Sequence, residues 1–317
     1  MTSTLALPFS YNYMQKNRIG VMANLFRASG YLHPQLANMP AYQCSAAAEL
    51  ALGRGEIDIL ITSPHYLLKD YPQFAVFGSI PMDLNPDLKN QWIKKNYFSI
   101  EKHYKEKGFA SDYMGLLSAL NCRLSSCTNE DFENWQSRKT PIVIAANGQR
   151  RLWFDHLGFN TLQGKYLDRL SYQFELMQKN KLEISDSASP GLIEECIKHN
   201  EKYNLVKNEF YNQKNLIIDS QSKSVIPIEI IYRKKLSEKL VKNLKIEVAQ
   251  IIATDVEYQA QAFDRLVSNH KLNVYDGLPK NLSQKLLRYK ETYLNLLSEY
   301  SVEAHSINCS YRKEQII

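Results

Sequence analysis

The sequence predicts an α/β fold built as two lobes, and three observations support this prediction. Short apolar runs alternate with amphipathic stretches along the 317 residues, which is typical of parallel strands covered by helices. A helix end, a tight turn and an acid-bearing strand at 50–59 (LALGRGEIDI) are echoed at 176–185 (LMQKNKLEIS), which indicates two similar halves. No Gly or Pro occurs from about 233 to 271, where apolar residues recur at three- and four-residue spacing. This run predicts one helix of about 55 Å, enough to span both lobes, or two helices joined by a bend.

The remaining elements follow from local patterns and from the glycines that end helices. In the first part of the chain we expect a strand at 4–8, a helix at 13–29 closed by Gly30, a helix at 45–52 ended by Gly53 and Gly55, and a strand at 57–61. Further along we expect a helix at 92–107, a strand at 141–146, a helix at 149–157 ended by Gly158, and a last helix at 282–300 after the turn 276–279.

The domain division follows from the two halves and the long helix. We assign lobe 1 to residues 1–118 and about 206–245, and lobe 2 to about 119–205 and about 246–317. The helix at about 233–271 spans both lobes. Because open α/β sheets bind ligands beyond the carboxyl ends of their strands, we expect a site where the two lobes meet.

Composition and charge exclude several classes of function. The net charge is +6, but the basic residues are scattered and form no dense stripe of the kind that nucleic acids need. Neither a phosphate loop nor a nucleophile elbow nor metal-ligand spacing of cysteines is present, so we expect no metal and no cofactor.

The start of the sequence and its cysteines bear on localisation. The five cysteines are an odd number and favour a reducing compartment. There is no charged leader with a long apolar segment, and no run approaches the roughly 20 apolar residues that span a bilayer. As the sequence stands we expect a cytoplasmic protein, or a periplasmic one if it is a processed form.

Four segments follow one another along the chain: 47–58 (AAELALGRGEID), 70–82 (DYPQFAVFGSIPM), 90–92 (NQW) and 154–158 (FDHLG). In this order they resemble the solute-binding proteins of TRAP (tripartite ATP-independent periplasmic) transporters, especially the keto-acid-binding branch. The unbroken helix from about 233 is similar to the family's long connecting helix. The resemblance implies a two-lobed, periplasmic-binding-protein-like fold with a hinge cleft. It also implies closure on a small carboxylate and delivery to a membrane permease.

The sequence departs from the family at three ligand-binding positions. The resemblance puts Ala145 where the family has an arginine that grips the substrate carboxylate. It puts Tyr113 where the keto-acid branch has a glutamine, and Asp186–Ser187 where that branch has Glu–Trp. An alignment shifted by a residue or two is one explanation, and compensation by Arg150 or Arg151 is another. Otherwise the ligand is not a simple carboxylate, and Asp186 would suit an amine.

Candidate ligand-binding residues lie at strand ends and in the loops that follow them. They are Tyr11, Tyr13, His65, Tyr66, Asp112, Tyr113, Asn147, Gln149, Asp186 and Ser187. Each residue type is also common in purely structural roles, such as helix capping by Asp186.

Two functions from different classes fit this pattern. The first is reversible binding of one small molecule, with a TRAP permease as partner if the protein is exported. The second is a cytoplasmic, cofactor-independent enzyme (a cyclase, lyase or isomerase) built on the same scaffold. In the enzyme, His65 or Asp186 would act as general base and Tyr113 or Tyr66 as proton donor. A cytosolic sensor is a third reading.

Overall fold

The computed structural model describes residues 19–22, 41–42, 45–64, 71–78, 80, 83–118, 122–126, 143–145, 154–162, 184–185, 215–218, 225–270, 273–276 and 280–314. The chain divides into two compact units. Unit 1 comprises residues 1–78, 90–117 and 226–255, and unit 2 comprises residues 79–89, 118–225 and 256–317. The lobe boundaries inferred from the sequence stay a prediction, and each unit is described by itself below.

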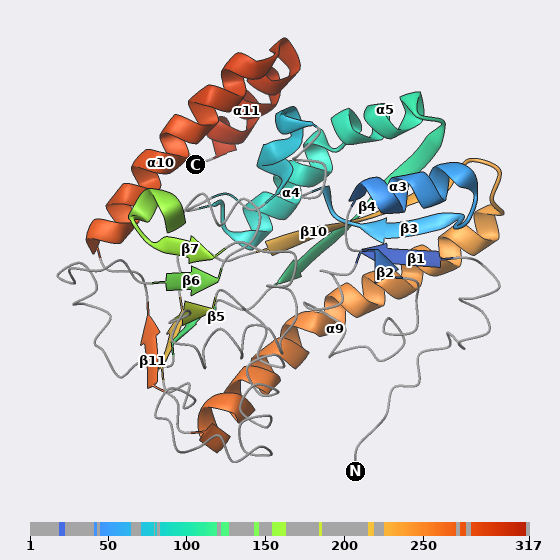
Figure 1. Cartoon of the computed structure of the whole chain (residues 1–317). Helices are drawn as coiled ribbons and strands as arrows, with labels where there is room; N and C mark the ends of the chain where they lie inside the picture. The colour runs from blue at the N-terminus through green and yellow to red at the C-terminus, as the bar shows by residue number, and fades with distance from the viewer. Residues whose placement is uncertain are drawn as a thin grey trace. The chain divides into compact units, whose positions relative to one another are not determined.

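A five-stranded sheet with the order β2-β1-β3-β10-β4 forms the centre of unit 1 (Figure 1). Its strands are β1 (Ile19–Met22), β2 (Ala41–Tyr42), β3 (Ile59–Thr62), β4 (Phe109–Ser118) and β10 (Val225–Arg233). Strand β1 runs parallel to β2 and β3, whereas β10 is antiparallel to β3. All four residues of β3 are buried, as expected for a β-branched, apolar strand covered on both faces.

Helices cover both faces of this sheet. From one face, the segment formed by α4 (Pro86–Asn96) and α5 (Phe98–Glu106) sends Tyr97 and Tyr104 to Glu229 of β10. From the other face, Lys245 in the first part of α9 (Glu238–His270) reaches Asp112 of β4. The 3-10 helix η3 (Pro72–Phe77) adds buried aromatic rings, of which Phe77 packs on Trp92 with ring centroids 4.9 Å apart.

Helix α3 (Ser45–Arg54) ends in a Schellman motif. The backbone N–H of Glu56 donates to the Ala51 carbonyl at 2.9 Å, and Gly55 supplies the left-handed residue with φ 77. The guanidinium of Arg233 donates to the Leu52 carbonyl at 2.7 Å and to the Gly53 carbonyl at 2.9 Å. The last residue of β10 therefore supplies a donor to the Gly53 carbonyl and a second donor to the Leu52 carbonyl, which also accepts from the Gly55 N–H at 3.2 Å.

Unit 2 contains a six-stranded mixed sheet with the order β11-β9-β5-β8-β6-β7. Its strands are β5 (Cys122–Ser126), β6 (Val143–Ala145), β7 (Asn160–Leu162), β8 (Ile184–Ser185), β9 (Asn215–Ile218) and β11 (Asn273–Asp276). Strand β6 is parallel to both β7 and β8, and β5 is antiparallel to β8 and β9. The later part of α9, from residue 256, belongs to this unit.

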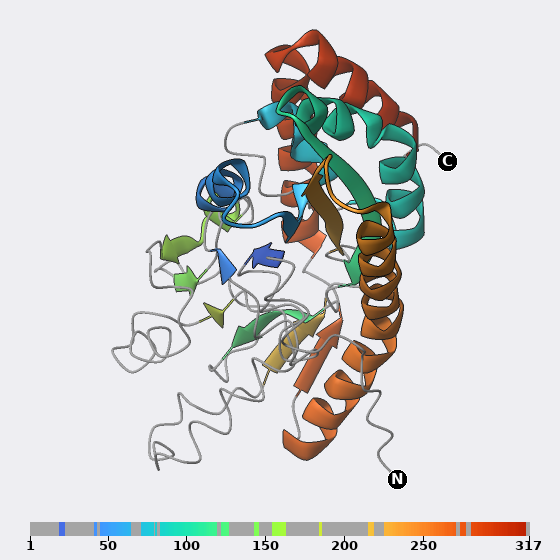
Figure 2. The same cartoon turned by 90° about the vertical axis from the view of Figure 1, so that its right-hand side faces the viewer.

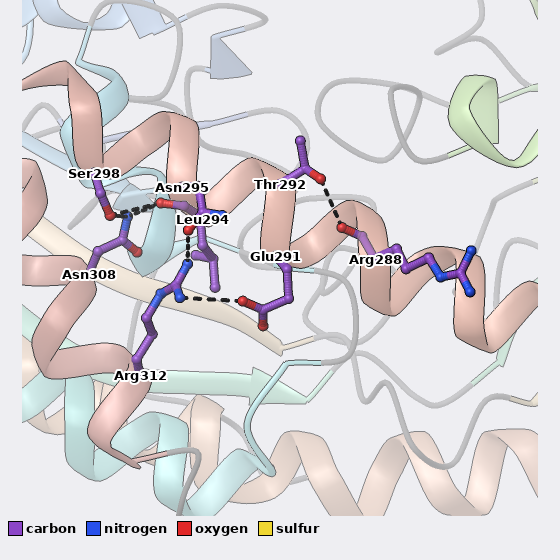
Figure 3. Close-up of polar contacts among 8 residues, drawn as sticks. All are labelled: Arg288, Glu291, Thr292, Leu294, Asn295, Ser298, Asn308 and Arg312. Carbon is purple, nitrogen blue, oxygen red and sulfur yellow. Dashed lines mark hydrogen bonds and ion pairs between the residues drawn. The ribbon is translucent and has the colours of Figure 1, made fainter.

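Helices α10 (Lys280–Tyr300) and α11 (Val302–Glu314) of unit 2 form a hairpin, and Figure 2 shows them side by side as Figure 1 does. Asn308 is 1% exposed and donates from its amide to the Leu294 carbonyl at 2.8 Å and to the Ser298 hydroxyl at 3.0 Å (Figure 3). Nearer the surface, Arg312 contacts Glu291 at 3.3 Å and donates to Asn295 at 2.7 Å. In the described part of the chain no helix is long and apolar enough to cross a bilayer.

Several elements differ from the sequence-based prediction. The helix expected at 13–29 is wrong at residues 19–22, where the structure has β1. An apolar run of this length fits a buried strand as well as a helix, and pairing with β2 and β3 decides the outcome. The expected helix at 92–107 is two helices, α4 and α5, separated at Tyr97.

The long helix is confirmed as a single helix of 33 residues, but it starts at Glu238 because residues 225–233 form β10. The last predicted helix is confirmed as α10, and the sequence analysis missed α11 and β11. Residues 154–157 are helical and end at Gly158, whose φ is 88. The strand expected at 4–8 lies outside the described residues.

Candidate functional site

Eight of the ten predicted ligand-binding residues lie outside the described residues. They are Tyr11, Tyr13, His65, Tyr66, Asn147, Gln149, Asp186 and Ser187. Two of the three proposed catalytic residues, His65 and Asp186, are among them. The roles of all eight stay predictions, and the structure describes the strands β3, β6 and β8 that precede His65, Asn147 and Asp186.

The strands that lead to Asn147 and Asp186 are neighbours in unit 2. Strands β6 and β8 run parallel, and Ala145 at the end of β6 is in register with Ser185 at the end of β8. On the other side, Ala145 is in register with Leu162 of β7. Because parallel strands bring their carboxyl ends to one edge, these three residues mark one edge of the sheet, and none of them carries a charge.

Asp112 and Tyr113 are described, and their side chains reach opposite faces of β4 in unit 1. Successive side chains of a strand point to opposite faces. Asp112 pairs with Lys245 of α9 at 2.6 Å, with about a third of each side chain exposed. Tyr113 instead donates its hydroxyl to Asn90 Oδ1 of α4 at 2.9 Å. The sequence predicts that Asp112 and Tyr113 contact the same ligand. In the structure Asp112 contacts α9 on one face of the sheet, and Tyr113 contacts α4 on the other face.

The Asp112–Lys245 pair lies beside Tyr232. The Lys245 ammonium is 5.8 Å from the centre of the Tyr232 ring. Burial first, and then the hydrogen bond and negative charge of Asp112, raise the pKa of Tyr232 to about 12. Asp112 therefore has a cation and a phenol as partners within unit 1.

Tyr113 packs against a second tyrosine. Its ring centroid is 5.7 Å from that of Tyr97, and burial raises its pKa above the ordinary value for tyrosine. The hydroxyl therefore keeps its proton near neutral pH and acts as a hydrogen-bond donor. A direct contact with a ligand stays a prediction.

A buried carboxyl that the sequence analysis missed lies in the middle of the unit 1 sheet. Glu229 of β10 is 0% exposed. Its Oε2 accepts a hydrogen bond from Tyr97 at 2.8 Å, and its Oε1 accepts one from Tyr104 at 3.0 Å. Burial raises the pKa of Glu229 to about 8 despite these two donors. The signal in the sequence is one acid inside the apolar strand VIPIEIIYR.

A second buried polar cluster, the Asp83 cluster, lies in unit 2 and consists of Asp83, Lys89, Lys290 and Tyr311. Asp83 pairs with Lys89 at 3.0 Å and accepts a hydrogen bond from the Tyr311 hydroxyl. The Lys290 ammonium is 5.9 Å from the centre of the Tyr311 ring. Burial lowers the pKa of Lys89 and of Lys290, and the negative charge of Asp83 opposes that effect for both. The cluster ties the segment 83–89 to α10 and α11.

The described residues contain no group of three or more His, Cys, Asp or Glu side chains placed to hold a metal ion.

No protein-family model matches the chain, and no curated protein matches its sequence. Solved structures do match it over nearly its whole length. A TRAP transporter solute-binding protein from Bordetella bronchiseptica, with calcium and picolinate bound, has a TM-score of 0.65 at 12% identity and covers 94% of this chain and 90% of its own.

Two further structures show the same similarity. A TRAP periplasmic solute-binding protein from Colwellia psychrerythraea, with calcium and pyruvate bound, has a TM-score of 0.64 at 10% identity, with 93% of each chain covered. The periplasmic ectoine-binding protein of a TRAP transporter from Halomonas elongata has a TM-score of 0.58 at 12% identity and covers 93% of this chain and 98% of its own. The predicted α/β fold is confirmed: the chain has the fold of the TRAP solute-binding proteins.

Proposed function

We propose that this protein reversibly binds one small organic molecule and does not convert it. The observation that supports this most is the fold, which spans more than nine tenths of the chain in each of the three comparisons. The proteins compared bind picolinate, pyruvate or ectoine. We infer the class of ligand from the residues of this chain, because function depends on the site rather than on the fold.

The ligand is, in this proposal, neutral or amine-bearing rather than a simple carboxylate. Ala145 ends β6 with a methyl group, at the position where the resemblance expects a guanidinium. Its neighbours in register, Ser185 and Leu162, supply no positive charge. A carboxylate taken out of water needs such a charge or several hydrogen bonds, because burying it alone is very costly.

Native mass spectrometry of the purified protein tests both parts of the proposal. A ligand that co-purifies in stoichiometric amount, is released intact and carries no carboxylate supports them. Calorimetric titration with pyruvate, picolinate and ectoine should give no tight binding, because each of the three carries a carboxylate. Conversion of the released ligand in the same sample would instead support the cofactor-independent enzyme.

A matched pair of variants tests the role of position 145. In Ala145→Arg the guanidinium should weaken retention of the natural ligand and create measurable binding of pyruvate or picolinate. Ala145→Leu adds bulk without charge and should weaken retention without creating carboxylate binding. Tight pyruvate binding by the unaltered protein would contradict the proposal.

A TRAP permease is the partner that fits a binding role of this kind. This part of the proposal requires that the native protein be exported. Cell fractionation with an antibody against the folded protein tests it. Recovery in the periplasmic fraction supports delivery to a permease, whereas recovery only in the cytosol contradicts it.

A further inference from the structure

Glu229 is a fully buried carboxyl group in the unit 1 sheet. Strand β10 lies between β3 and β4, and Glu229 is in register with Thr62 at the end of β3. Its neighbours Ile228 and Ile230 are 3% and 0% exposed. A charge at this position has no access to water, so its compensation must come from protein groups.

The groups that act on Glu229 are phenols and another acid. Tyr97 and Tyr104 each donate one hydrogen bond to the carboxyl, and Glu49 of α3 adds a negative charge that disfavours ionisation. From β4, the charge of Asp112 acts on Tyr97 rather than on Glu229. Among these groups none is cationic.

The described cations around β10 are paired with other acids, and Arg233 at the end of the strand lies 3.9 Å from Asp58. Lys107 contacts Glu49 at 2.9 Å, about a third of each side chain being exposed. Lys245 pairs with Asp112 through α9, on the opposite face of the sheet. Among the described residues, the side chains that donate to an ionised Glu229 are therefore two neutral phenols.

Both protonation states of Glu229 can satisfy the same hydrogen bonds. The ionised carboxylate accepts from both phenols. The neutral acid donates its own proton to one phenol oxygen and accepts from the other phenol. The two states therefore differ in whether the core contains an uncompensated charge, and not in the number of hydrogen bonds.

We propose that Glu229, Tyr97 and Tyr104 form a proton switch in unit 1. With its proton, the carboxyl locks β10 to α5, and loss of that proton puts a charge into the core and loosens this contact.

The switch operates just above neutral pH. Burial raises the pKa of Glu229 to about 8, so the proton stays on at neutral pH and is released by mild alkalinisation. The effect reaches β4, because the Tyr97 ring packs on Tyr113, which in turn donates to Asn90. The proposal holds for the free protein and does not depend on the identity of any ligand.

Hydrogen exchange of the free protein between about pH 6 and about pH 9.5 tests the switch, with rates corrected for base catalysis. Amide protection in β10 and α5 should fall at least several-fold across the pH range around 8, relative to α10 in the same sample. In Glu229→Gln, which keeps the shape and stays neutral, this selective loss should disappear. Glu56→Gln, at an exposed acid of the same unit, should behave like the unaltered protein.

Infrared spectroscopy detects the proton directly. The carbonyl band of a protonated carboxyl should be present at about pH 6, disappear around pH 8 and be absent throughout in Glu229→Gln. Tyr97→Phe and Tyr104→Phe each remove a donor that favours the charged form, so the band should persist to higher pH in both.

Three results would overturn the proposal. They are absence of the band in the unaltered protein at about pH 6, equal exchange in the unaltered protein and Glu229→Gln, and an unshifted band in both phenylalanine variants. Because no ligand enters these measurements, their failure and the failure of the binding proposal are distinguishable.

Discussion

Gly53 and Gly55 lie two residues apart at the end of α3 but have different backbone conformations. Gly53 is inside the helix, and a Cβ atom there would meet nothing within 4 Å. Gly55 has φ +77, and a Cβ atom there would lie 3.0 Å from Arg233 Nη2. Alanine should therefore have opposite effects on stability at these two positions.

We expect Gly55→Ala to lower the free energy of unfolding by about 1–2 kcal/mol, because alanine would have to adopt the left-handed backbone and displace the Arg233 guanidinium. Gly53→Ala should raise it by about 0.5–1 kcal/mol through its greater helix propensity. Chemical denaturation of both variants measures the difference. A stabilised Gly55→Ala would show that the Schellman turn is not retained in solution.

Glu229 should make stability depend on pH in a defined direction. Its pKa is raised from 4.5 to about 8, so the folded state holds a proton that the unfolded state has released. The free energy of unfolding is therefore highest at pH values below the pKa of Glu229 in the unfolded state. It falls as the pH rises from 4.5 to about 8 and levels off above the pKa of Glu229 in the folded state. At full effect the loss is on the order of 3–5 kcal/mol.

Glu229→Gln removes this dependence. The free energy of unfolding of the variant minus that of the unaltered protein should therefore rise from about pH 5 to about pH 8 and then stay constant. Denaturant titrations at closely spaced pH values give the two curves. A constant difference between them across this range would contradict the raised pKa.

Among the elements, the α10–α11 hairpin combines a buried polar contact with an exposed ion pair. Asn308 is buried between the helices, whereas the Arg312 and Glu291 side chains are 35% and 50% exposed. Loss of a hydrogen bond costs more free energy when it leaves a buried polar group without a partner. Exposed ion pairs contribute little because water and salt screen them.

We expect Asn308→Ala to lower the free energy of unfolding by about 1–3 kcal/mol, because the Ser298 hydroxyl loses its donor and the Leu294 carbonyl keeps only the Ser298 hydroxyl as a side-chain donor. Arg312→Ala should cost no more than about 1 kcal/mol. Thermal unfolding of the two variants in the same buffer compares them. Equal losses would indicate that the buried amide has no special role in the hairpin.

The elements that the sequence predicts well are those whose pattern has one interpretation. Helix α9 is predictable because 33 residues carry helical spacing without Gly or Pro. The first residue of α9 is not predictable, because Pro227 and Glu229 interrupt the apolar pattern of β10 and make that strand hard to recognise. Strand β1 was missed because its apolar run is strand-forming only once β2 and β3 pair with it.

At the scale of the whole molecule, the order of segments along the chain predicts the fold but not the buried polar groups. The carboxyl ends of β3, β6 and β8 follow from local patterns, and most candidate ligand contacts lie just beyond them. Glu229 could not be paired from sequence, because Tyr97 and Tyr104 are 132 and 125 positions away. Only the folded sheet brings these groups together.

Unit 2 depends on the Asp83 cluster, which joins distant parts of the chain. We expect Asp83→Asn to lower the free energy of unfolding by about 3–5 kcal/mol, because the fully buried Lys89 would lose its counter-ion. Asp87→Asn, at an exposed acid in the first turn of α4, should cost at most about 1 kcal/mol. Limited proteolysis with mass mapping should show cleavage of unit 2 segments first in Asp83→Asn. Cleavage confined to unit 1 would contradict this assignment.

Asp83 and Tyr311 are 228 positions apart in the chain. A ribosome that adds about 5–20 residues per second needs on the order of 10–45 s to make the stretch between them. During that time the nascent chain contains Asp83 and Lys89 but not Tyr311, whose hydroxyl later donates to Asp83. The Asp83 cluster therefore cannot close before Tyr311 has been synthesised, and until then the segment 83–89 lacks its partner from α11.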